Sequence, residues 1–136
     1  MTVIGYTAGV FDILHMGHIN ILRNAKAVCD YLIVGVTTDQ LAEEAKGKRP
    51  VQLFEERIEI VRSLRFVDAA IPQDTYDKTA LHERLKFDVM IVGDDWFGKW
   101  EKWEGALKGV RIIYFPRTGG VSSTKLRGKL ARGGGC

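Results

Sequence analysis

The chain has 136 residues, of which 46% are hydrophobic and 27% are charged, and its net charge is +3. This length suits one domain that buries a core without disulfides or structural metals, and neither Cys29 nor Cys136 lies in a metal-binding pattern. No apolar run approaches the roughly 20 residues of a membrane-spanning helix, and no secretion signal opens the chain. We therefore expect a cytoplasmic protein with one domain over residues 1–131 and a flexible tail at 132–136.

The first elements enclose a turn that is rich in histidine and glycine. An apolar run at 3–6 predicts a strand, a helical pattern covers 19–29, and the sequence AGVFDILHMGH lies between them. The first turn of a helix has unpaired N–H groups and a positive dipole end, which stabilise phosphate. His15 and His18 flank this position, and Gly17 has no Cβ to obstruct a phosphate. The turn predicts a triphosphate site, with a structural metal site or a packed turn as the alternative.

The next segment combines a buried strand with a cationic loop. Residues 31–37 form a nearly continuous β-branched run, which is typical of a strand in the middle of a parallel sheet. Thr38 and Asp39 can cap a short helix that continues to Ala45. The sequence KGKRP at 46–50 has three cations and two helix breakers, so we predict a loop there.

The rest of the chain alternates helices and strands. Helical spacing at 53–64 places Ile58, Val61 and Leu64 inward. We expect a strand at 67–71 that stops before Pro72, a helix at 79–85, and strands at 89–93 and 111–115. This alternation predicts an α/β fold: a single Rossmann-like, doubly wound parallel sheet with helices on both faces and right-handed crossovers.

Two further segments follow predicted strands. Asp94, Asp95 and Trp96 stand directly after the 89–93 strand, at the edge where open α/β sheets bind ligands. The sequence PRTGGVSSTK at 116–125 follows the last strand and offers glycines, hydroxyl residues that can cap a helix, and an arginine fork. It predicts a second phosphate-binding turn, with an ordinary capped helix as the alternative.

These motifs together resemble a known family. HMGH at 15–18 matches the H-x-G-H motif of the nucleotidyltransferase superfamily, and RTGGVSST at 117–124 is similar to the R-T-x-G-x-S-T-T motif of cytidylyltransferases. With GDDW at 93–96, the chain looks like the glycerol-3-phosphate cytidylyltransferase branch from residue 2 to about residue 130.

The resemblance implies transfer of CMP from CTP to an alcohol phosphate, giving CDP-glycerol and pyrophosphate if the acceptor is glycerol 3-phosphate. The implied catalytic residues are His15, His18, Lys46 and Arg117. The implied nucleotide site comprises Gly9, Val10, Phe11, His15, Gly17, His18, Lys48, Arg117, Thr118, Gly119, Val121, Ser122, Ser123 and Thr124. The implied acceptor site comprises Lys46, Lys78, Asp94, Asp95 and Trp96.

The resemblance also implies Mg²⁺, bound mainly through the CTP phosphates, and a homodimer without nucleic-acid or membrane partners. Val10, Ser123 and Tyr76 depart from the family pattern, and Lys78 lies about one position from its substrate lysine. Phosphocholine, phosphoethanolamine or another polyol phosphate therefore stays open as the acceptor. An adenylyltransferase of the same fold is a further alternative, and so is nucleic-acid binding by the basic C-terminal segment. The tryptophans at 96, 100 and 103 suit core or dimer packing, or a cation cage.

Overall fold

A computed structural model of the chain describes residues 2–93 and 107–115. Five parallel strands form one sheet in the order β3-β2-β1-β4-β5. Their bounds are Ile4–Gly9 (β1), Tyr31–Thr37 (β2), Ala69–Gln73 (β3), Val89–Gly93 (β4) and Arg111–Phe115 (β5). This sheet confirms the α/β fold that the sequence predicts.

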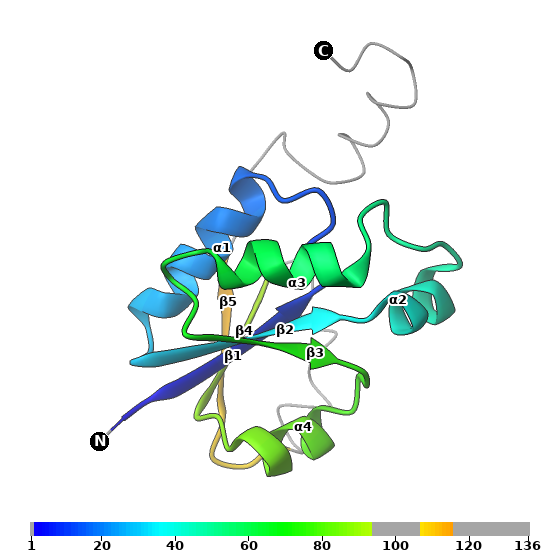
Figure 1. Cartoon of the computed structure of the whole chain (residues 1–136). Helices are drawn as coiled ribbons and strands as arrows, with labels where there is room; N and C mark the ends of the chain where they lie inside the picture. Colours follow the sequence, from blue (N-terminus) through cyan, green and yellow to red (C-terminus); the bar gives the residue numbers. More distant parts are fainter. Residues whose placement is uncertain (1, 94–106, 116–136) are drawn as a thin grey trace.

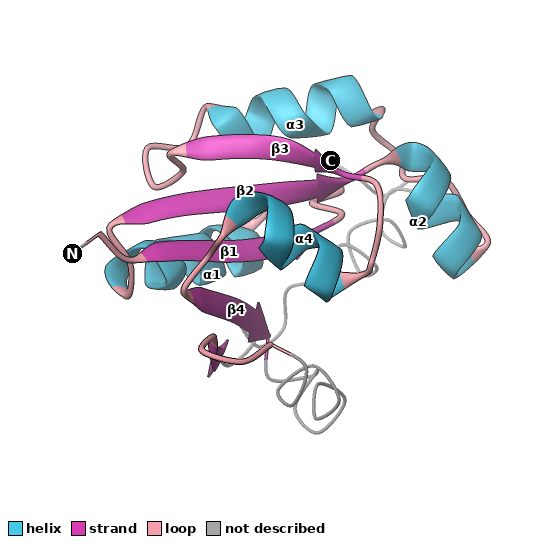
Figure 2. Cartoon of the chain, turned by 90° about the horizontal axis from the view of Figure 1, so that it is seen from below, coloured by secondary structure: helices cyan, strands magenta, loops and turns pink. Residues whose placement is uncertain are grey.

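Helices cover both faces of the sheet. The described helices are α1 (Met16–Ala27), α2 (Asp39–Lys46), α3 (Phe54–Arg62) and α4 (Lys78–Leu85). Figure 1 shows α1 and α3 on one face and α4 on the other, while α2 lies beyond the carboxyl end of β2. The same layers are visible from below in Figure 2. None of the helices in these ranges is long and apolar enough to cross a membrane.

The core consists of two clusters that the sheet separates. Alternate residues of β2 enter opposite clusters, because successive side chains of a strand point to opposite faces. One cluster joins the α1 and α3 side of the sheet and includes Leu22, Ala25, Leu32, Val34, Val36, Ile58 and Val61. The other joins the α4 side and includes Tyr6, Ile33, Leu81, Phe87 and Met90. The buried β2 run therefore lies inside the sheet, as its composition predicts.

The first two elements differ from their predicted bounds. The β1 strand continues to Gly9 rather than stopping at residue 6, and α1 begins at Met16 rather than 19. The helix starts early because His15 caps it, which the apolar periodicity alone does not register. It also ends at Ala27, so Cys29 lies beyond it, with its Sγ donating to the Ala25 carbonyl at 3.3 Å.

The prediction that a strand stops before Pro72 is wrong, because Pro72 lies inside β3. Within the described part of the chain β3 pairs with β2 alone, and a proline at a sheet edge costs no ladder hydrogen bond. The α3 helix is shorter at both ends than the predicted 53–64, α2 is one residue longer than predicted, and α4 begins one residue early. The bounds of β2, β4 and β5 are as predicted. The tryptophans at 96, 100 and 103, the 131/132 boundary and Cys136 lie outside the described residues.

Candidate active site

Three strands end together at one edge of the sheet. The register pairs Tyr6 with Met90, so the end of β1 at Gly9 lies beside the end of β4 at Gly93, and β5 ends beside it at Phe115. The strand order reverses between β1 and β4, since β2 and β3 extend one way and β4 and β5 the other. Ligands of open α/β sheets bind outside the carboxyl ends at such a reversal. Residues 10–18, the histidine turn, leave β1 at this point.

The two histidines of the turn form the N-terminal cap of α1. The Nδ1 atom of His15 accepts the N–H of Gly17 at 3.0 Å, and the Nδ1 atom of His18 accepts the N–H of His15 at 3.2 Å. This is a capping box made of two imidazoles. Because each Nδ1 is an acceptor, a neutral ring carries its proton on Nε2. The rings stack with centroids 4.0 Å apart, so the two Nε2–H groups belong to neighbouring rings.

His18 is neutral at physiological pH. Burial, together with a smaller effect of the nearby His15, lowers its pKa to about 4, although Asp12 acts in the opposite direction. The edge of the Phe11 ring packs against the imidazole, with centroids 5.5 Å apart. His18 can therefore donate a hydrogen bond to an anion without carrying a charge of its own.

The part of the histidine turn that precedes His15 contains two strained residues. Phe11 and Ile13 have φ angles of 54° and 53°, a left-handed conformation that is uncommon outside glycine and most unusual for a β-branched residue. The buried carboxylate of Asp12 accepts the N–H groups of Val51 and Gln52 at 2.9 and 3.0 Å. The N–H of Ile13 donates to Gln52 Oε1 at 2.9 Å. Residues 51–52 thus hold the strained part of the turn.

Arg57 of α3 joins the carboxyl ends of two strands. Its fully buried guanidinium donates to the carbonyls of Val10 at 2.7 Å and Thr37 at 2.8 Å, and its Nε donates to the Gln52 carbonyl at 3.0 Å. The fourth acceptor is Asp39 Oδ1 at 2.6 Å. Burial alone would raise the Asp39 pKa, but the hydrogen bonds from Arg57 and from a backbone N–H outweigh it and lower the pKa.

Arg57, Gln52 and Gln73 are not among the residues that the sequence motifs predict for the site. A signal for Arg57 existed, because positions 57, 58 and 61 share the inward face of α3, and a cation there needs buried acceptors. No pattern marked Gln52 or Gln73, whose contacts come from other elements.

The cationic loop divides into two parts. Lys46 is the last residue of α2, and Lys48 follows Gly47, whose φ of 74° ends the helix in the left-handed conformation. Both lysines are exposed, and neither ammonium group has an ion pair or hydrogen bond with another residue in 2–93 or 107–115. Arg49 instead pairs with Glu43 at 2.6 Å. Lys46 and Lys48 are therefore solvated cations in the segment that leads to residues 51–52.

Lys78 belongs to a buried polar cluster at the carboxyl end of β3. Its ammonium donates to Gln73 Oε1 at 3.3 Å and lies 5.8 Å from the centre of the Tyr76 ring. The same Gln73 oxygen accepts from Tyr6 at 3.0 Å, and the Gln73 amide donates to Thr37 Oγ1 at 3.2 Å. Burial lowers the pKa of Lys78 to about 8. The amine therefore changes charge near physiological pH.

The backbone of the histidine turn is largely engaged within the protein. The Val10 carbonyl accepts from Arg57, and the Gly17 N–H donates to His15. At Gly9, a Cβ would come within 3.3 Å of the Phe11 ring. Gly9 and Phe11 thus shape the turn, and the two imidazoles are its chemically versatile groups.

The predicted residues that follow β4 and β5 lie outside the described residues. They are Asp94, Asp95, Trp96, Arg117, Thr118, Gly119, Val121, Ser122, Ser123 and Thr124. β4 and β5 nevertheless end at the edge from which the histidine turn departs.

Comparison with known proteins identifies the family. A family model described as cytidylyltransferase-like matches residues 6–129. The chain belongs to this family. It is 36% identical over 127 residues to the glycerol-3-phosphate cytidylyltransferase of Bacillus subtilis (strain 168), covering 92% of this chain and 95% of that protein. The cytidylyltransferase-like chain is therefore a nucleotidyltransferase enzyme.

One further protein is similar in sequence, and another is similar in structure. The enzyme is 40% identical over 90 residues to FAD synthase of Thermococcus sibiricus (strain DSM 12597 / MM 739), covering 65% of this chain and 61% of that protein. A lipopolysaccharide core biosynthesis protein from Thermoplasma volcanium GSS1 has a structure that matches with a TM-score of 0.75 at 30% identity. That match covers 87% of this chain and 99% of the other.

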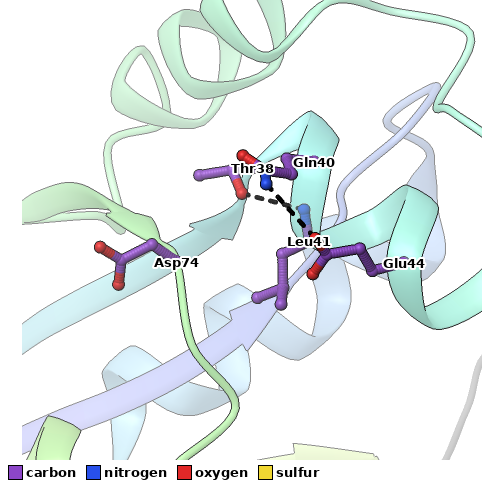
Figure 3. A pocket seen from close by; sticks show the side chains of 5 residues that line it. All are labelled: Thr38, Gln40, Leu41, Glu44 and Asp74. Atoms are coloured by element: carbon purple, nitrogen blue, oxygen red, sulfur yellow. Dashed lines mark hydrogen bonds between the residues drawn. The ribbon is translucent and has the colours of Figure 1, made fainter.

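A pocket of about 250 Å³ lies apart from the histidine turn, between α2 with its N-cap and the residue after β3. Figure 3 shows its lining, which comprises Thr38, Gln40, Leu41, Glu44 and Asp74. None of these is a predicted site residue of the nucleotidyltransferase, and the two carboxylates would repel phosphate. The lining of this pocket therefore does not suit a triphosphate.

Proposed function

We propose that this nucleotidyltransferase transfers CMP from CTP to glycerol 3-phosphate, forming CDP-glycerol and pyrophosphate. The observation that carries the proposal is the similarity to a glycerol-3-phosphate cytidylyltransferase over nearly the whole of both chains. The paired imidazoles at the N-terminus of α1 support it, because they suit an anionic, phosphate-rich substrate.

The reaction needs no covalent intermediate on the enzyme. A phosphate oxygen of the acceptor attacks the α-phosphorus of CTP, and the bond from that phosphorus to the bridging oxygen breaks. Pyrophosphate leaves with the bonding electrons, and no proton transfer is required when the acceptor phosphate is a dianion. Catalysis then depends on positioning and on stabilising the charge that builds on the phosphoryl oxygens.

The histidine turn would supply two donors for this charge. The Nε2–H groups of His15 and His18 would hydrogen-bond to phosphate oxygens, and neutral His18 stays a donor throughout the physiological pH range. Lys46 and Lys48 would neutralise phosphate charge, Lys46 toward the acceptor and Lys48 toward the triphosphate. In the same proposal Arg117, with the hydroxyl residues at 122–124, would hold the leaving phosphates.

We place the acceptor phosphate near Lys78. Its buried ammonium is fixed by Gln73, and a partly desolvated cation attracts phosphate more strongly than a solvated one. Asp94, Asp95 and Trp96 complete the proposed acceptor site.

We further propose that Mg²⁺ accompanies CTP and that the enzyme is a homodimer. Among the described residues, no three His, Cys, Asp or Glu side chains are grouped to hold a metal. These residues do not form a cage, so the ion would depend on phosphate oxygens, and no step above passes through it. Exposed apolar side chains at Met16, Val51 and Leu53 on the histidine turn and the segment bound to it support a protein partner. Light scattering of the purified chain tests the dimer.

Pyrophosphate release from a crossed panel tests the function. CTP, ATP, GTP and UTP are each combined with glycerol 3-phosphate, phosphocholine, phosphoethanolamine and a sugar phosphate. We expect turnover with CTP and glycerol 3-phosphate to exceed all other pairs. Activity confined to ATP, which the similarity to FAD synthase makes the second candidate, would overturn the choice of nucleotide. A preference for another phosphate would overturn only the acceptor.

A further inference from the structure

We propose that Gln52 is a positioning residue for the histidine turn: its carboxamide holds Ile13 in the left-handed conformation that aims His15 and His18 at the substrate. The proposal starts from the hydrogen bond between the Ile13 N–H and Gln52 Oε1, at 2.9 Å. Ile13 has a φ of 53°, which isoleucine adopts only when its surroundings impose it. The Gln52 oxygen is the contact that fixes this N–H.

Gln52 is itself fixed from two sides, so its oxygen is placed in advance. Its backbone N–H donates to Asp12 Oδ1 at 3.0 Å, and its carbonyl accepts from Arg57 Nε at 3.0 Å. Arg57 also donates to the Val10 carbonyl, at the start of the turn. Hydrogen bonds therefore hold the turn at Val10, Asp12 and Ile13. Among the side chains of the described residues that make these bonds, Gln52 alone can be replaced without removing a charge.

The Gln52–Ile13 hydrogen bond affects the orientation of the histidines through the backbone. Ile13 precedes His15 by two residues, and the His15 N–H donates to His18 Nδ1 at 3.2 Å. A rotation at Ile13 would redirect this N–H and weaken the bond that orients the His18 ring. Since the same ring nitrogen fixes which tautomer His18 adopts, both the direction and the proton of its Nε2 depend on Ile13.

Gln52 also links two parts of the proposed phosphate site. Lys46 and Lys48 precede it by six and four residues in the same connection. Its bond to Ile13 therefore ties the cationic loop to the imidazole donors. Loss of this bond would misplace the imidazole donors. We expect turnover to fall more than substrate binding, because the donors act mainly on charge that develops in the transition state.

The test compares Gln52→Met, which keeps the side-chain length but removes the acceptor, with Gln52→Glu, which keeps an acceptor oxygen. Gln40→Met is the matched control, because both glutamines donate to a glutamate four residues on: Gln52 to Glu56 at 3.5 Å and Gln40 to Glu44 at 3.3 Å. Among the described residues, Gln40 makes no hydrogen bond to the histidine turn. Hydrogen exchange at the Ile13 amide and the ring NMR signals of His15 and His18 are measured in the full chain. We expect Gln52→Met to speed Ile13 exchange at least about tenfold and to shift both sets of ring signals, while β2 amides keep their protection. Gln52→Glu should restore both.

The kinetic arm rests on the proposed function and uses CTP with glycerol 3-phosphate. Gln52→Met should lower kcat by about 10- to 100-fold with KM for CTP changed less than about threefold. In a His18→Ala background it should cost little more, because its effect passes through that ring. Unchanged Ile13 exchange and ring signals in Gln52→Met would overturn the inference, and so would equal effects from Gln40→Met. Absence of turnover by the unaltered enzyme would instead overturn the proposed function, with the NMR results still deciding the role of Gln52.

Discussion

His18 caps the residue that caps its own helix: its Nδ1 accepts the N–H of His15, whose Nδ1 in turn accepts the N–H of Gly17. The two catalytic candidates of the H-x-G-H motif are therefore also its local structural supports. The intervening glycine supplies the N–H that orients the first ring. In each ring Nδ1 makes the capping hydrogen bond and Nε2–H is the proposed donor to phosphate, so substitutions can test the two roles separately.

The first prediction separates the two nitrogens of His18. In His18→Asn the shorter side chain retains an acceptor near Nδ1, so the cap survives, but the Nε2–H donor is lost. In His18→Gln the amide reaches the Nε2 position, but the cap is lost. We expect the Asn variant to lose about 10²- to 10³-fold in kcat with little change in stability. The Gln variant should lose about 1 kcal/mol of unfolding free energy, as capping changes do.

Steady-state pyrophosphate release and urea unfolding measure these two quantities on each variant. A His18→Asn enzyme that turns over like the unaltered one would remove the donor role of this imidazole. Equal losses of unfolding free energy in both variants would show that the Nδ1 hydrogen bond does not itself contribute to stability.

The second prediction concerns acid sensitivity. The His18 pKa is about 4 in the folded chain and about 6.5 when the chain is unfolded, so only the unfolded state gains a proton in this interval. Stability from this group is therefore complete above pH 6.5 and decreases as the pH falls to 4, by about 3 kcal/mol at most. Urea unfolding at pH 7.5 and 5.0 measures the loss. The His18→Asn variant should show a clearly smaller loss, and an identical pH dependence would contradict the assignment.

The third prediction is that Arg57 supports the fold around the site. Arg57→Met keeps the stem but removes donors to three carbonyls and one carboxylate, leaving Asp39 half-paired near the protein interior. We expect a loss of about 3–5 kcal/mol of unfolding free energy, as for a buried ion pair broken on one side. Arg62→Met on the same helix is the control, since Arg62 is exposed and its change should stay within about 0.5 kcal/mol. Chemical denaturation compares the two, and similar losses would argue against the role of Arg57.

The sequence predicted the sheet and its strand positions well because buried parallel strands are nearly continuous apolar runs, as in β2 and β4. It missed the ends of elements where a side chain from elsewhere decides them. His15 extends α1 backwards, and Asp39 of α2 accepts the first N–H of α3 at 3.1 Å because Leu53 cannot cap it. Hydrophobic periodicity cannot predict such contacts, because it describes only the segment in which it is found.

The same limit applies to the site. The histidines, Lys46 and Lys48 are visible as a local motif and a charge run. Gln52 and Gln73 act through bonds to residues 39 and 67 positions away, so single-sequence reasoning gives them no role. The prediction for residues 94–96 and 117–124 stays a prediction, since these residues lie outside the described ranges.

The fourth prediction tests the close contact under β2. A Cβ on Gly35 would collide with the hydroxyl group of Tyr6, whose ring passes beneath the strand to reach Gln73. Gly35→Ala should cost about 1–3 kcal/mol, as overpacking does in cores. Tyr6→Phe removes the hydroxyl, so the double variant should lose less than the two single variants combined. Strictly additive losses in urea unfolding would rule out this contact as the reason for glycine.

The fifth prediction concerns the acceptor and Lys78. Lys78→Met should raise KM for glycerol 3-phosphate about 10- to 100-fold, since a hydrogen bond to a charged group is lost, and should leave KM for CTP nearly unchanged. The Lys78 pKa is lowered to about 8, so raising the pH through 8 removes the ammonium. KM for the acceptor should therefore rise above pH 8 in the unaltered enzyme and stay flat in the Met variant. Lys108→Met, at an exposed lysine before the amino end of β5, is the control. An unchanged acceptor KM in Lys78→Met would move the acceptor phosphate away from this cluster, because a buried ammonium that touched it could not be replaced by a thioether without loss of binding.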